Sequence, residues 1–224
     1  MLAMMLLADL FSAIQSQDLP QVRELLRKDP SLAAARDEKG TSAVSAAFTV
    51  QRAEGFLPRY ENPILDALLA LHPPLNPLET CMAGDVKPLL ANEFARTVFK
   101  NGWTPLHAAA FGGNVTAARL LLDAGADLNA RAKNQFDNTP LQVAMLTRSH
   151  AVAMLLLSRG ANVNALQAEG VTALHEAAQS GDVEMIRALL AAGADPRISA
   201  KQFGTARDLA LKAKHEEAAR LLAP

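Results

Sequence analysis

A six-residue motif that occurs four times in the second half of the chain, in worn form after the first copy, constrains the fold more than any other feature. Its first copy is Gly102-Trp103-Thr104-Pro105-Leu106-His107. The motif threonine returns at intervals of 35, 33 and 33 residues, as Thr139, Thr172 and Thr205. A second marker, Gly-Ala-Asp or Gly-Ala-Asn, keeps the same step at Gly125, Gly160 and Gly193. Two markers in phase at a period near 33 residues indicate an array of repeated structural units.

The stretch 102–133 predicts the layout of one unit, which is turn, helix, turn, helix and loop. Thr104 is placed to cap a first helix, and Pro105 fits its first turn, where the missing N–H is not needed. Asn114 is placed to cap a second helix whose apolar residues fall on one face. Across the four units, the predicted helices cover residues 105–111, 115–123, 141–147, 151–158, 174–180, 183–191, 206–213 and 216–222.

The first hundred residues carry the same pattern in a degenerate form. Residues 10–17 and 18–28 are predicted to form a first helix pair. A second unit opens near Gly40 and contains a helix over residues 64–71. The helix predicted over residues 78–83 begins a third unit, which the spacing to Thr104 shortens by about one helical turn.

With its Thr-Pro-Leu-His box and its period, the chain resembles ankyrin-repeat proteins, in particular the bacterial single-array kind. The motifs are specific over residues 101–224 and only suggestive over residues 5–100. The resemblance implies an all-α solenoid of about seven stacked helix-turn-helix units with protruding loops. Residues 1–224 would then form one array, with degenerate repeats over 5–100, well-formed repeats over 101–200 and a capping repeat over 201–224.

Five positions depart from the family pattern. Gln142 and Asp208 replace the motif histidine in repeats five and seven. Ala206 stands where repeat four has Pro105, and Asp137 and Phe203 replace the motif glycine.

The composition fits closely stacked helices and disfavours some partners. Hydrophobic residues make up 50% of the chain and aromatic residues only 4%, so the apolar mass is mainly alanine and leucine. The net charge is −1, and neither half has the basic excess that binding to a phosphate backbone needs. The composition therefore argues against a nucleic-acid partner.

The single cysteine and the N-terminus give expectations about burial and about the cellular compartment. Cys81 is predicted to be a small buried core residue. The apolar residues 1–8 are interpreted as part of the first repeat, with a signal peptide as the alternative, and the true start could be Met1, Met4 or Met5. Because no apolar run approaches the roughly 18 residues of a membrane span, we expect a cytoplasmic protein that is not membrane-bound.

No catalytic or metal-binding pattern stands out among the polar residues. The resemblance implies that His107 and His175 are structural, and two repeat steps would put them about 20 Å apart, too far for one metal. No zinc-site spacing, nucleophile elbow or phosphate loop is present. We therefore expect no enzyme activity, no cofactor and no metal.

The resemblance places partner-binding residues at the loop tips and on the exposed face of the first helices. Carried onto this chain, with the basic residues beside the tips, the candidates are Lys100, Trp103, Phe111, Arg131, Lys133, Gln135, Phe136, Asn138, Leu146, Glu169, Gln179, Lys201 and Lys212.

Three of these candidates are aromatic, at positions where the repeat does not require an aromatic residue: Trp103, Phe111 and Phe136. We hypothesise that they form a docking strip rimmed by Lys100, Arg131 and Lys133, because aromatic anchors often dominate binding energy. The alternative is that Trp103 and Phe136 simply pack against each other between neighbouring loops.

A second candidate is the loop over residues 52–63, which contains Phe56, Leu57 and the only tyrosine, Tyr60. Long loops are often functional. The favoured alternative is that these residues plug the gap left by the shortened third repeat.

The leading functional prediction is a non-enzymatic scaffold, expected to be a monomer, that binds a protein partner through its concave face and loop tips. The alternatives are a regulatory or inhibitory accessory subunit of a co-expressed enzyme, and an exported protein acting outside the cytoplasm.

Overall fold

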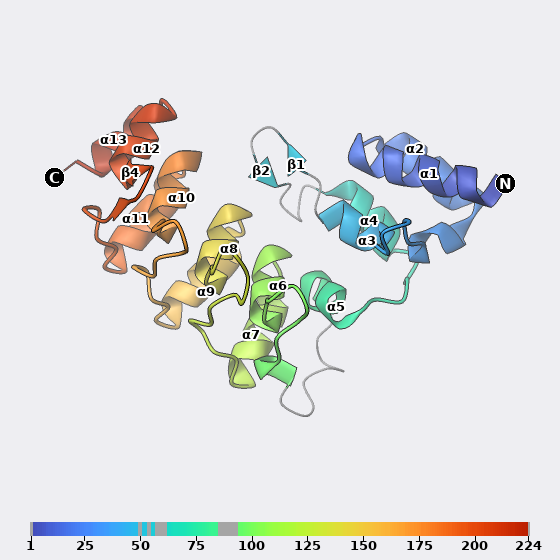
Figure 1. The fold of residues 1–224 in the computed structure, drawn as a ribbon, viewed down its shortest axis with the longest axis horizontal. Helices are drawn as coiled ribbons and strands as arrows, with labels where there is room; N and C mark the ends of the chain where they lie inside the picture. The colour runs from blue at the N-terminus through green and yellow to red at the C-terminus, as the bar shows by residue number, and fades with distance from the viewer. Residues whose placement is uncertain (1, 49–50, 53–54, 57–61, 85–93, 224) are drawn as a thin grey trace. The chain divides into compact units, whose positions relative to one another are not determined.

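The computed structural model describes residues 2–48, 51–52, 55–56, 62–84 and 94–223, and it divides the chain into two compact units. The N-terminal unit is Met1–Thr80 and the C-terminal unit is Cys81–Pro224. Figure 1 shows both as helical throughout, with two short strand pairs. The all-α repeat fold is confirmed, while one continuous array over residues 1–224 stays a prediction.

The N-terminal unit begins with the helix pair that the sequence predicts. Helix α1 (Leu2–Gln15) packs against α2 (Leu19–Lys28) and also contacts α3 (Ala43–Phe48). The side chain of Asp18 caps α2 by accepting from the N–H of Gln21 at 3.0 Å. Helix α1 starts earlier than the predicted residue 10, because the apolar N-terminal stretch is helical, in agreement with its interpretation as part of the first repeat.

The rest of this unit continues the degenerate pattern. A 3-10 turn η1 (Pro30–Ala34) follows α2, and α4 (Pro63–Leu69) is capped by Asn62. Helix α5 (Pro77–Ala83) matches the prediction for residues 78–83 and crosses the boundary between the units. The core of the unit contains fully or almost fully buried residues from α1, α2 and α4: Leu10, Ile14, Val22, Ile64, Leu65 and Leu68.

A buried polar cluster joins α3 to the start of α5 within the N-terminal unit. Glu79 is fully buried, and its Oε1 accepts hydrogen bonds from the hydroxyls of Ser42 and Ser45, the latter at 2.7 Å. Its Oε2 accepts from the N–H of Asn76 at 2.9 Å, and the Asn76 side chain accepts from the N–H of Glu79 at 3.0 Å. Three donors therefore satisfy a carboxylate that water does not reach.

A short hairpin lies in the predicted 52–63 loop. Strand β1 (Gln51–Arg52) pairs antiparallel with β2 (Gly55–Phe56), with Gln51 opposite Phe56. Residues 53–54 and 57–61, which include Leu57 and Tyr60, lie outside the described residues. The shortened part of the third repeat, residues 85–93, lies outside them too. Whether the loop is a functional element or a structural plug stays open.

The C-terminal unit contains four helix pairs after a 3-10 turn, η4 (Phe94–Arg96). The first helices are α6 (Pro105–Phe111), α8 (Pro140–Leu146), α10 (Ala173–Ser180) and α12 (Ala206–Lys212). The second helices are α7 (Val115–Asp123), α9 (His150–Ser158), α11 (Val183–Ala191) and α13 (Glu216–Leu221). All eight agree with the predicted ranges to within one residue at each end.

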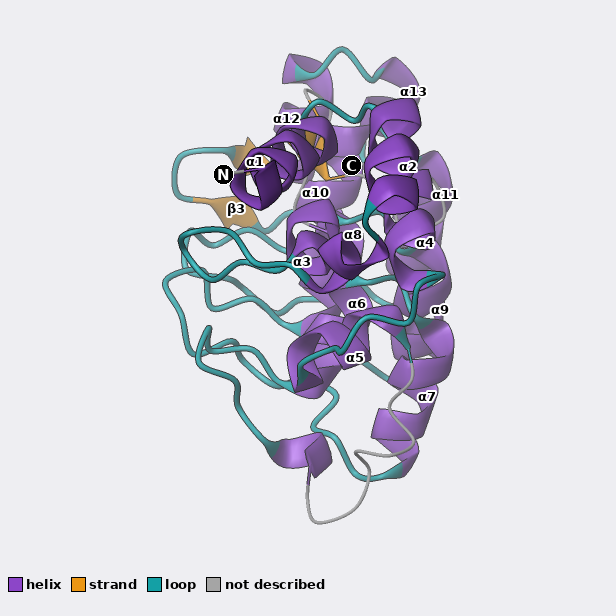
Figure 2. Ribbon diagram, turned by 90° about the vertical axis from the view of Figure 1, so that its right-hand side faces the viewer, coloured by secondary structure: helices purple, strands orange, loops and turns teal. Residues whose placement is uncertain are grey.

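The helices of this unit form two layers. First helices contact first helices and second helices contact second helices along the sequence, and each helix also contacts its own partner. In Figure 2 the connecting loops of the unit lie beside the first-helix layer, away from the second helices. Small residues allow this close stacking, since the Ala108, Ala109 and Ala110 side chains of α6 are fully buried.

The loop tips turn through residues with left-handed backbone. Gly102 (φ 82°), Asp137 (φ 54°) and Gly170 (φ 80°) hold this conformation in repeats four to six. In repeat seven the left-handed residue is Gly204 (φ 73°), one position later, so Phe203 replaces the motif glycine without backbone strain. This last tip is a hairpin in which β3 (Ser199–Ala200) pairs antiparallel with β4 (Gly204–Thr205).

Within the described part of the chain, no helix combines the length and the apolar character that crossing a membrane would need. Cys81 is fully buried, as predicted, and burial raises the pKa of its thiol to about 12.

Candidate functional site

The motif residues at the start of each first helix are used by the fold. Thr104 has an extended backbone and caps α6, with Pro105 at the first helical position. The Nδ1 atom of His107 accepts from the N–H of Thr104 at 3.2 Å, so the proton of the neutral ring lies on Nε2. Nε2 then donates to the carbonyl of Asn138 in the next repeat at 2.9 Å.

His175 repeats this arrangement two units later. Its Nδ1 accepts from the N–H of Thr172 at 3.2 Å, and its Nε2 donates to the carbonyl of Gly204 at 3.0 Å. Burial lowers the pKa of both His107 and His175, partly offset by the carbonyl each one faces. The structural role that the resemblance implied for these two histidines is confirmed.

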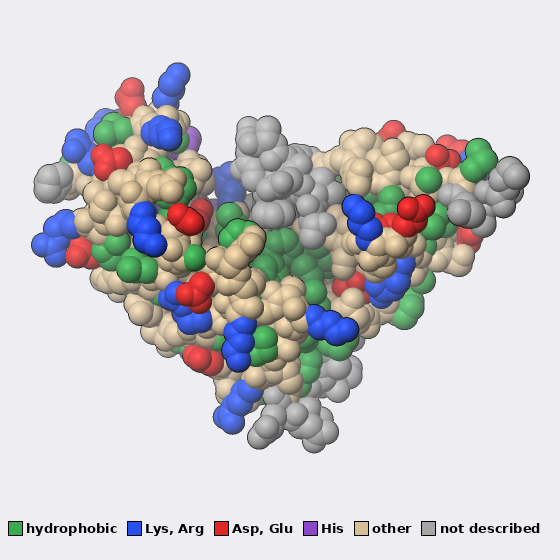
Figure 3. Space-filling model, viewed as in Figure 1, with side chains coloured by type: hydrophobic (Ala, Val, Ile, Leu, Met, Phe, Trp, Pro, Cys, Tyr) green, Lys and Arg blue, Asp and Glu red, His purple; other side chains and the backbone are tan. Residues whose placement is uncertain are grey.

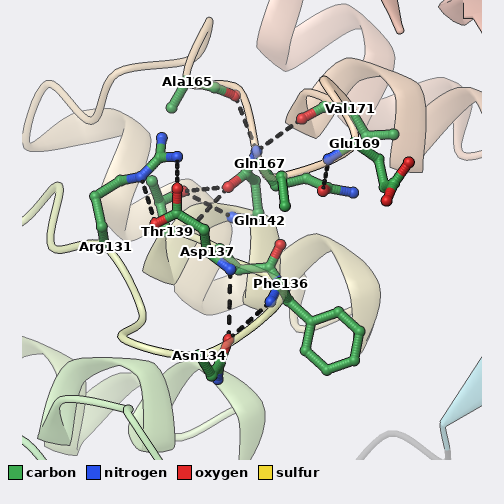
Figure 4. Close-up of polar contacts among 12 residues, drawn as sticks. Arg131, Asn134, Phe136, Asp137, Thr139, Gln142, Ala165, Gln167, Glu169 and Val171 are labelled. Atoms are coloured by element: carbon green, nitrogen blue, oxygen red, sulfur yellow. Dashed lines mark hydrogen bonds and ion pairs between the residues drawn. The ribbon is translucent and has the colours of Figure 1, made fainter. Parts of the chain in front are cut away.

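Gln142 performs the same task in repeat five with an amide. Its Oε1 accepts from the N–H of Thr139 at 2.8 Å, and its Nε2 donates to the carbonyls of Ala165 and Val171 at 2.9 and 3.0 Å. Figure 4 shows this side chain in the middle of the network. Asp208 keeps only the first half of the task, accepting from the N–H of Thr205 at 2.8 Å, since a carboxylate has no proton to donate onward.

The three aromatic candidates do not form one exposed strip. The Trp103 ring packs on Phe111 with centroids 5.1 Å apart, and it stacks on His107 at 6.5 Å. Phe111 is buried, with 9% of its surface exposed, which corrects the expectation that the fold does not need this side chain. Trp103 and Phe136 make no ring contact with each other, so the proposed packing between loops is wrong as well.

Phe136 is the aromatic candidate that is open to solvent, with 56% of its surface exposed. The hydrogen bond from its own N–H to the Asn134 side chain, at 3.0 Å, fixes the backbone of the tip. Figure 4 shows its ring pointing away from the polar network around Arg131 and Gln142.

The basic residues proposed as a rim lie in different environments. Arg131 forms an ion pair with Asp137, which lowers the pKa of the Asp137 carboxyl. Arg131 and Lys133 line a pocket of about 410 Å³ together with Arg96, at the fourth repeat. Lys100 is exposed and does not line that pocket.

The tips of repeats five, six and seven enclose a second hollow, which we call the tip pocket. It has a volume of about 500 Å³. Its walls come from three tips and two first helices, and they consist of Gln135, Phe136, Gln167, Ala168, Glu169, Val171, Glu176, Gln179, Phe203 and Leu209. Four of the predicted candidates therefore come together here: Gln135, Phe136, Glu169 and Gln179.

The other candidates stand apart from this pocket. Asn138 is half-buried, and its carbonyl accepts the hydrogen bond of His107. Leu146 is 42% exposed at the end of α8, and Lys212 is exposed at the end of α12. The Nζ atom of Lys201 donates to the carbonyl of Ala168 at 3.5 Å, which holds it beside the pocket.

Sequence reasoning missed Glu176 and Phe203 as wall residues of the pocket. Phe203 was noted as a departure from the motif glycine, and it is 41% exposed. Glu176 occupies the position after the motif histidine, where repeats four, five and seven have buried Ala108, Val143 and Leu209. An acid in a row of buried apolar residues is a signal that aligning the four repeats with one another would have found.

Glu176 is a carboxylic acid whose pKa is strongly raised. Burial raises the pKa of its carboxyl to about 7. Among the described residues its side chain has no hydrogen-bond or ion-pair partner, and it opens into the tip pocket. The site therefore combines exposed rings with an unpaired carboxylate.

Stacked helix pairs with projecting tips, joined by a Thr-x-x-His or Thr-x-x-Gln box, define the class of helical repeat proteins. Comparison with models of known protein families identifies which family of repeat proteins this is. The family model described as "Ankyrin repeats (3 copies)" matches residues 130–200 and 157–224, and the model described as "Ankyrin repeat" matches residues 101–133. Together these matches cover more than half of the chain, and the chain belongs to the ankyrin-repeat family.

Two curated relatives from Caenorhabditis elegans illustrate the similarity. Over 112 residues, 50% of this chain, it is 37% identical to "Ankyrin repeat and KH domain-containing protein mask-1". Over 139 residues, 61% of this chain, it is 32% identical to "Transient receptor potential cation channel subfamily A member 1 homolog". The matched segments span only 4% and 11% of those proteins, respectively.

Proposed function

We propose that this protein is a non-enzymatic scaffold that binds a protein partner through the loop tips and first helices of repeats five to seven. Membership of the ankyrin-repeat family supports a role in protein interaction. The single observation that carries the location is the tip pocket, which Phe136 and Phe203 flank with 56% and 41% of their surfaces exposed. Exposed aromatic side chains beside a hollow are typical anchors for a protein partner.

The polar residues that invite a catalytic interpretation have other uses, which supports a non-enzymatic role. His107 and His175 cap first helices and bond the neighbouring repeat. Charged side chains of both signs are interspersed on the viewed face of the C-terminal unit, without a continuous basic field (Figure 3). This surface supports a protein partner better than a nucleic acid.

The test is affinity capture from native cells with the full chain and two variants. The F136A/F203A double variant removes the two exposed rings, and M154A removes a similarly exposed apolar side chain from the second-helix layer, where Met154 is 47% exposed. We expect wild type and M154A to retain the same partner and the double variant to lose at least about tenfold in affinity.

The direct interaction is then measured by calorimetry with the purified partner. Retention of the partner by the double variant at unchanged affinity would refute this docking surface. Trp103→Ala is unsuitable as a probe, because Trp103 packs on Phe111 and its loss would disturb the fold.

A further inference from the structure

The tip pocket carries an acidic side chain that the repeat does not require. At the position after the motif residue His, Gln or Asp, three repeats have an apolar side chain that is no more than 6% exposed: Ala108, Val143 and Leu209. The sixth repeat has Glu176 in the same row, half-buried and facing the pocket. A leucine or valine would fill this place, as it does in the neighbouring repeats, so packing alone does not explain the acid.

The pocket wall around Glu176 combines apolar and aromatic side chains with uncharged amides and one further acid, and it contains no basic residue. Phe136, Val171, Phe203 and Leu209 line the same hollow. Glu169 from the tip of repeat six and the side chains of Gln135 and Gln179 add acceptors. A carboxylate in such a place is costly until a cation pairs with it, and burial accordingly raises the pKa of Glu176 to about 7.

The other ionisable groups near the pocket are already engaged or point elsewhere. Lys201, on the tip of repeat seven, donates to the carbonyl of Ala168. The ring of His175 bonds Thr172 and the carbonyl of Gly204. The carboxylate of Asp208 accepts from Thr205. These contacts leave Glu176 and Glu169 as the charged groups that line the pocket.

We infer that the tip pocket binds an arginine side chain from the partner protein, with Glu176 as its ion-pair partner and the rings of Phe136 and Phe203 against its apolar stem. This inference rests on the proposed function and adds the chemistry of the partner. Charge complementarity and the aromatic walls select a cation, since cations are attracted to ring faces. Arginine fits better than lysine, because its planar, weakly hydrated group stacks on rings and donates to several acceptors at once.

The test is a titration followed by amide NMR signals of the full chain, with acetyl-arginine amide as the probe. Its neutral isostere acetyl-citrulline amide and acetyl-lysine amide are the comparison probes. We expect acetyl-arginine amide to shift the signals of Phe136, Glu169, Glu176 and Gln179, with a dissociation constant on the order of millimolar. Citrulline should bind at least about tenfold more weakly, because it lacks the charge.

Two variants make the test specific to the pocket. E176Q keeps the shape of the side chain and should weaken arginine binding about tenfold. E184Q changes an exposed acid on the second-helix layer and should leave binding unchanged. Arginine binding that equals citrulline binding, that survives E176Q or that maps elsewhere would overturn the inference, and tighter binding of lysine would overturn the choice of arginine.

These outcomes are separable from the proposed function. If the captured partner is lost with F136A/F203A but the arginine probe fails, the docking surface stands and the partner chemistry is wrong. If the probe binds as expected but F136A/F203A still captures the partner, the pocket chemistry stands and the docking surface is wrong.

Discussion

The two compact units satisfy the polar groups at the start of their first helices with different chemistry. In the C-terminal unit, His107, Gln142 and His175 bond main-chain carbonyls of the following repeat. In the N-terminal unit, the buried Glu79 carboxylate accepts from the side chains of Ser42 and Ser45.

This difference explains how the repeat motif can degenerate without loss of the fold. A main-chain carbonyl is present whatever the sequence, so histidine in repeats four and six and glutamine in repeat five can make the equivalent bond. A contact between side chains survives only while both partners remain. The contact at the start of the helix in the N-terminal unit therefore requires particular pairs of side chains. The contacts in the C-terminal unit require only one suitable donor side chain each.

The largest effect is expected from Glu79→Ala in the N-terminal unit. The variant removes the carboxylate that accepts from the buried hydroxyl of Ser42, from the half-buried hydroxyl of Ser45 and from the N–H of Asn76. We expect the free energy of unfolding to fall by about 3 kcal/mol, measured by urea denaturation. Glu38→Ala, at an exposed position, is the control and should change little. A loss as small as that of the control would mean that the cluster does not hold this unit together.

Two substitutions of one residue, His107→Ala and His107→Gln, test the corresponding polar contact in the C-terminal unit. Alanine removes the bridge to Asn138 and the support for Trp103, and we expect a loss of about 2 kcal/mol. Glutamine restores the bridge, as Gln142 does one repeat later, and should lose less than about 1 kcal/mol. Equal losses of stability for the two variants in thermal and urea denaturation would show that glutamine cannot replace histidine at this position.

Acid should weaken the C-terminal unit through its buried histidines. Burial lowers the pKa of His107 and His175 in the folded state below the ordinary 6.5, so the unfolded chain binds more protons as the pH falls below 6.5. Wild type should therefore lose about 1 kcal/mol more than H107Q/H175Q between pH 7 and pH 5. Hydrogen exchange at both pH values locates the effect, and parallel profiles for the two proteins would contradict it.

A pH-dependent effect of the opposite sign is expected from Glu176→Gln. The pKa of this carboxyl is raised from 4.5 to about 7 in the folded protein, so its ionisation weakens the fold progressively as the pH rises from 4.5 to 7. E176Q should be more stable than wild type by about 3 kcal/mol at pH 8, with no difference near pH 4. Unfolding curves at the two pH values measure this, and E184Q is the matched control. A pH-independent difference would mean that Glu176 is not desolvated.

Most of the fold could be predicted from the sequence because its signals are local. Capping residues such as Thr104, Asn114 and Asp182 each accept a hydrogen bond from a backbone N–H at the start of their own helix. Such contacts join residues three positions apart, so the spacing of residue types is enough to place them. The hairpin β1–β2 and the early start of α1 carry no comparable signal, and they were not predicted.

The candidate site was predictable only in part, since exposure depends on neighbours that are distant in sequence. Phe111 and Phe136 look alike as unusual aromatic residues, yet Phe111 is buried against Trp103 and Phe136 is 56% exposed. Glu176 and Phe203 become part of one pocket only when repeats six and seven stack. The spacing of a motif in the sequence does not show which side chains line the same pocket.

By itself, the sequence determined the repeat, its helices, its caps and the family to which the chain belongs, because a period of about 33 residues repeats the same local contacts. The tertiary structure decided which of the exceptional side chains are packed and which are open. It joined Phe136, Glu176 and Phe203 from three different repeats around one pocket, where burial changes the chemistry of an acid that would be ordinary in water.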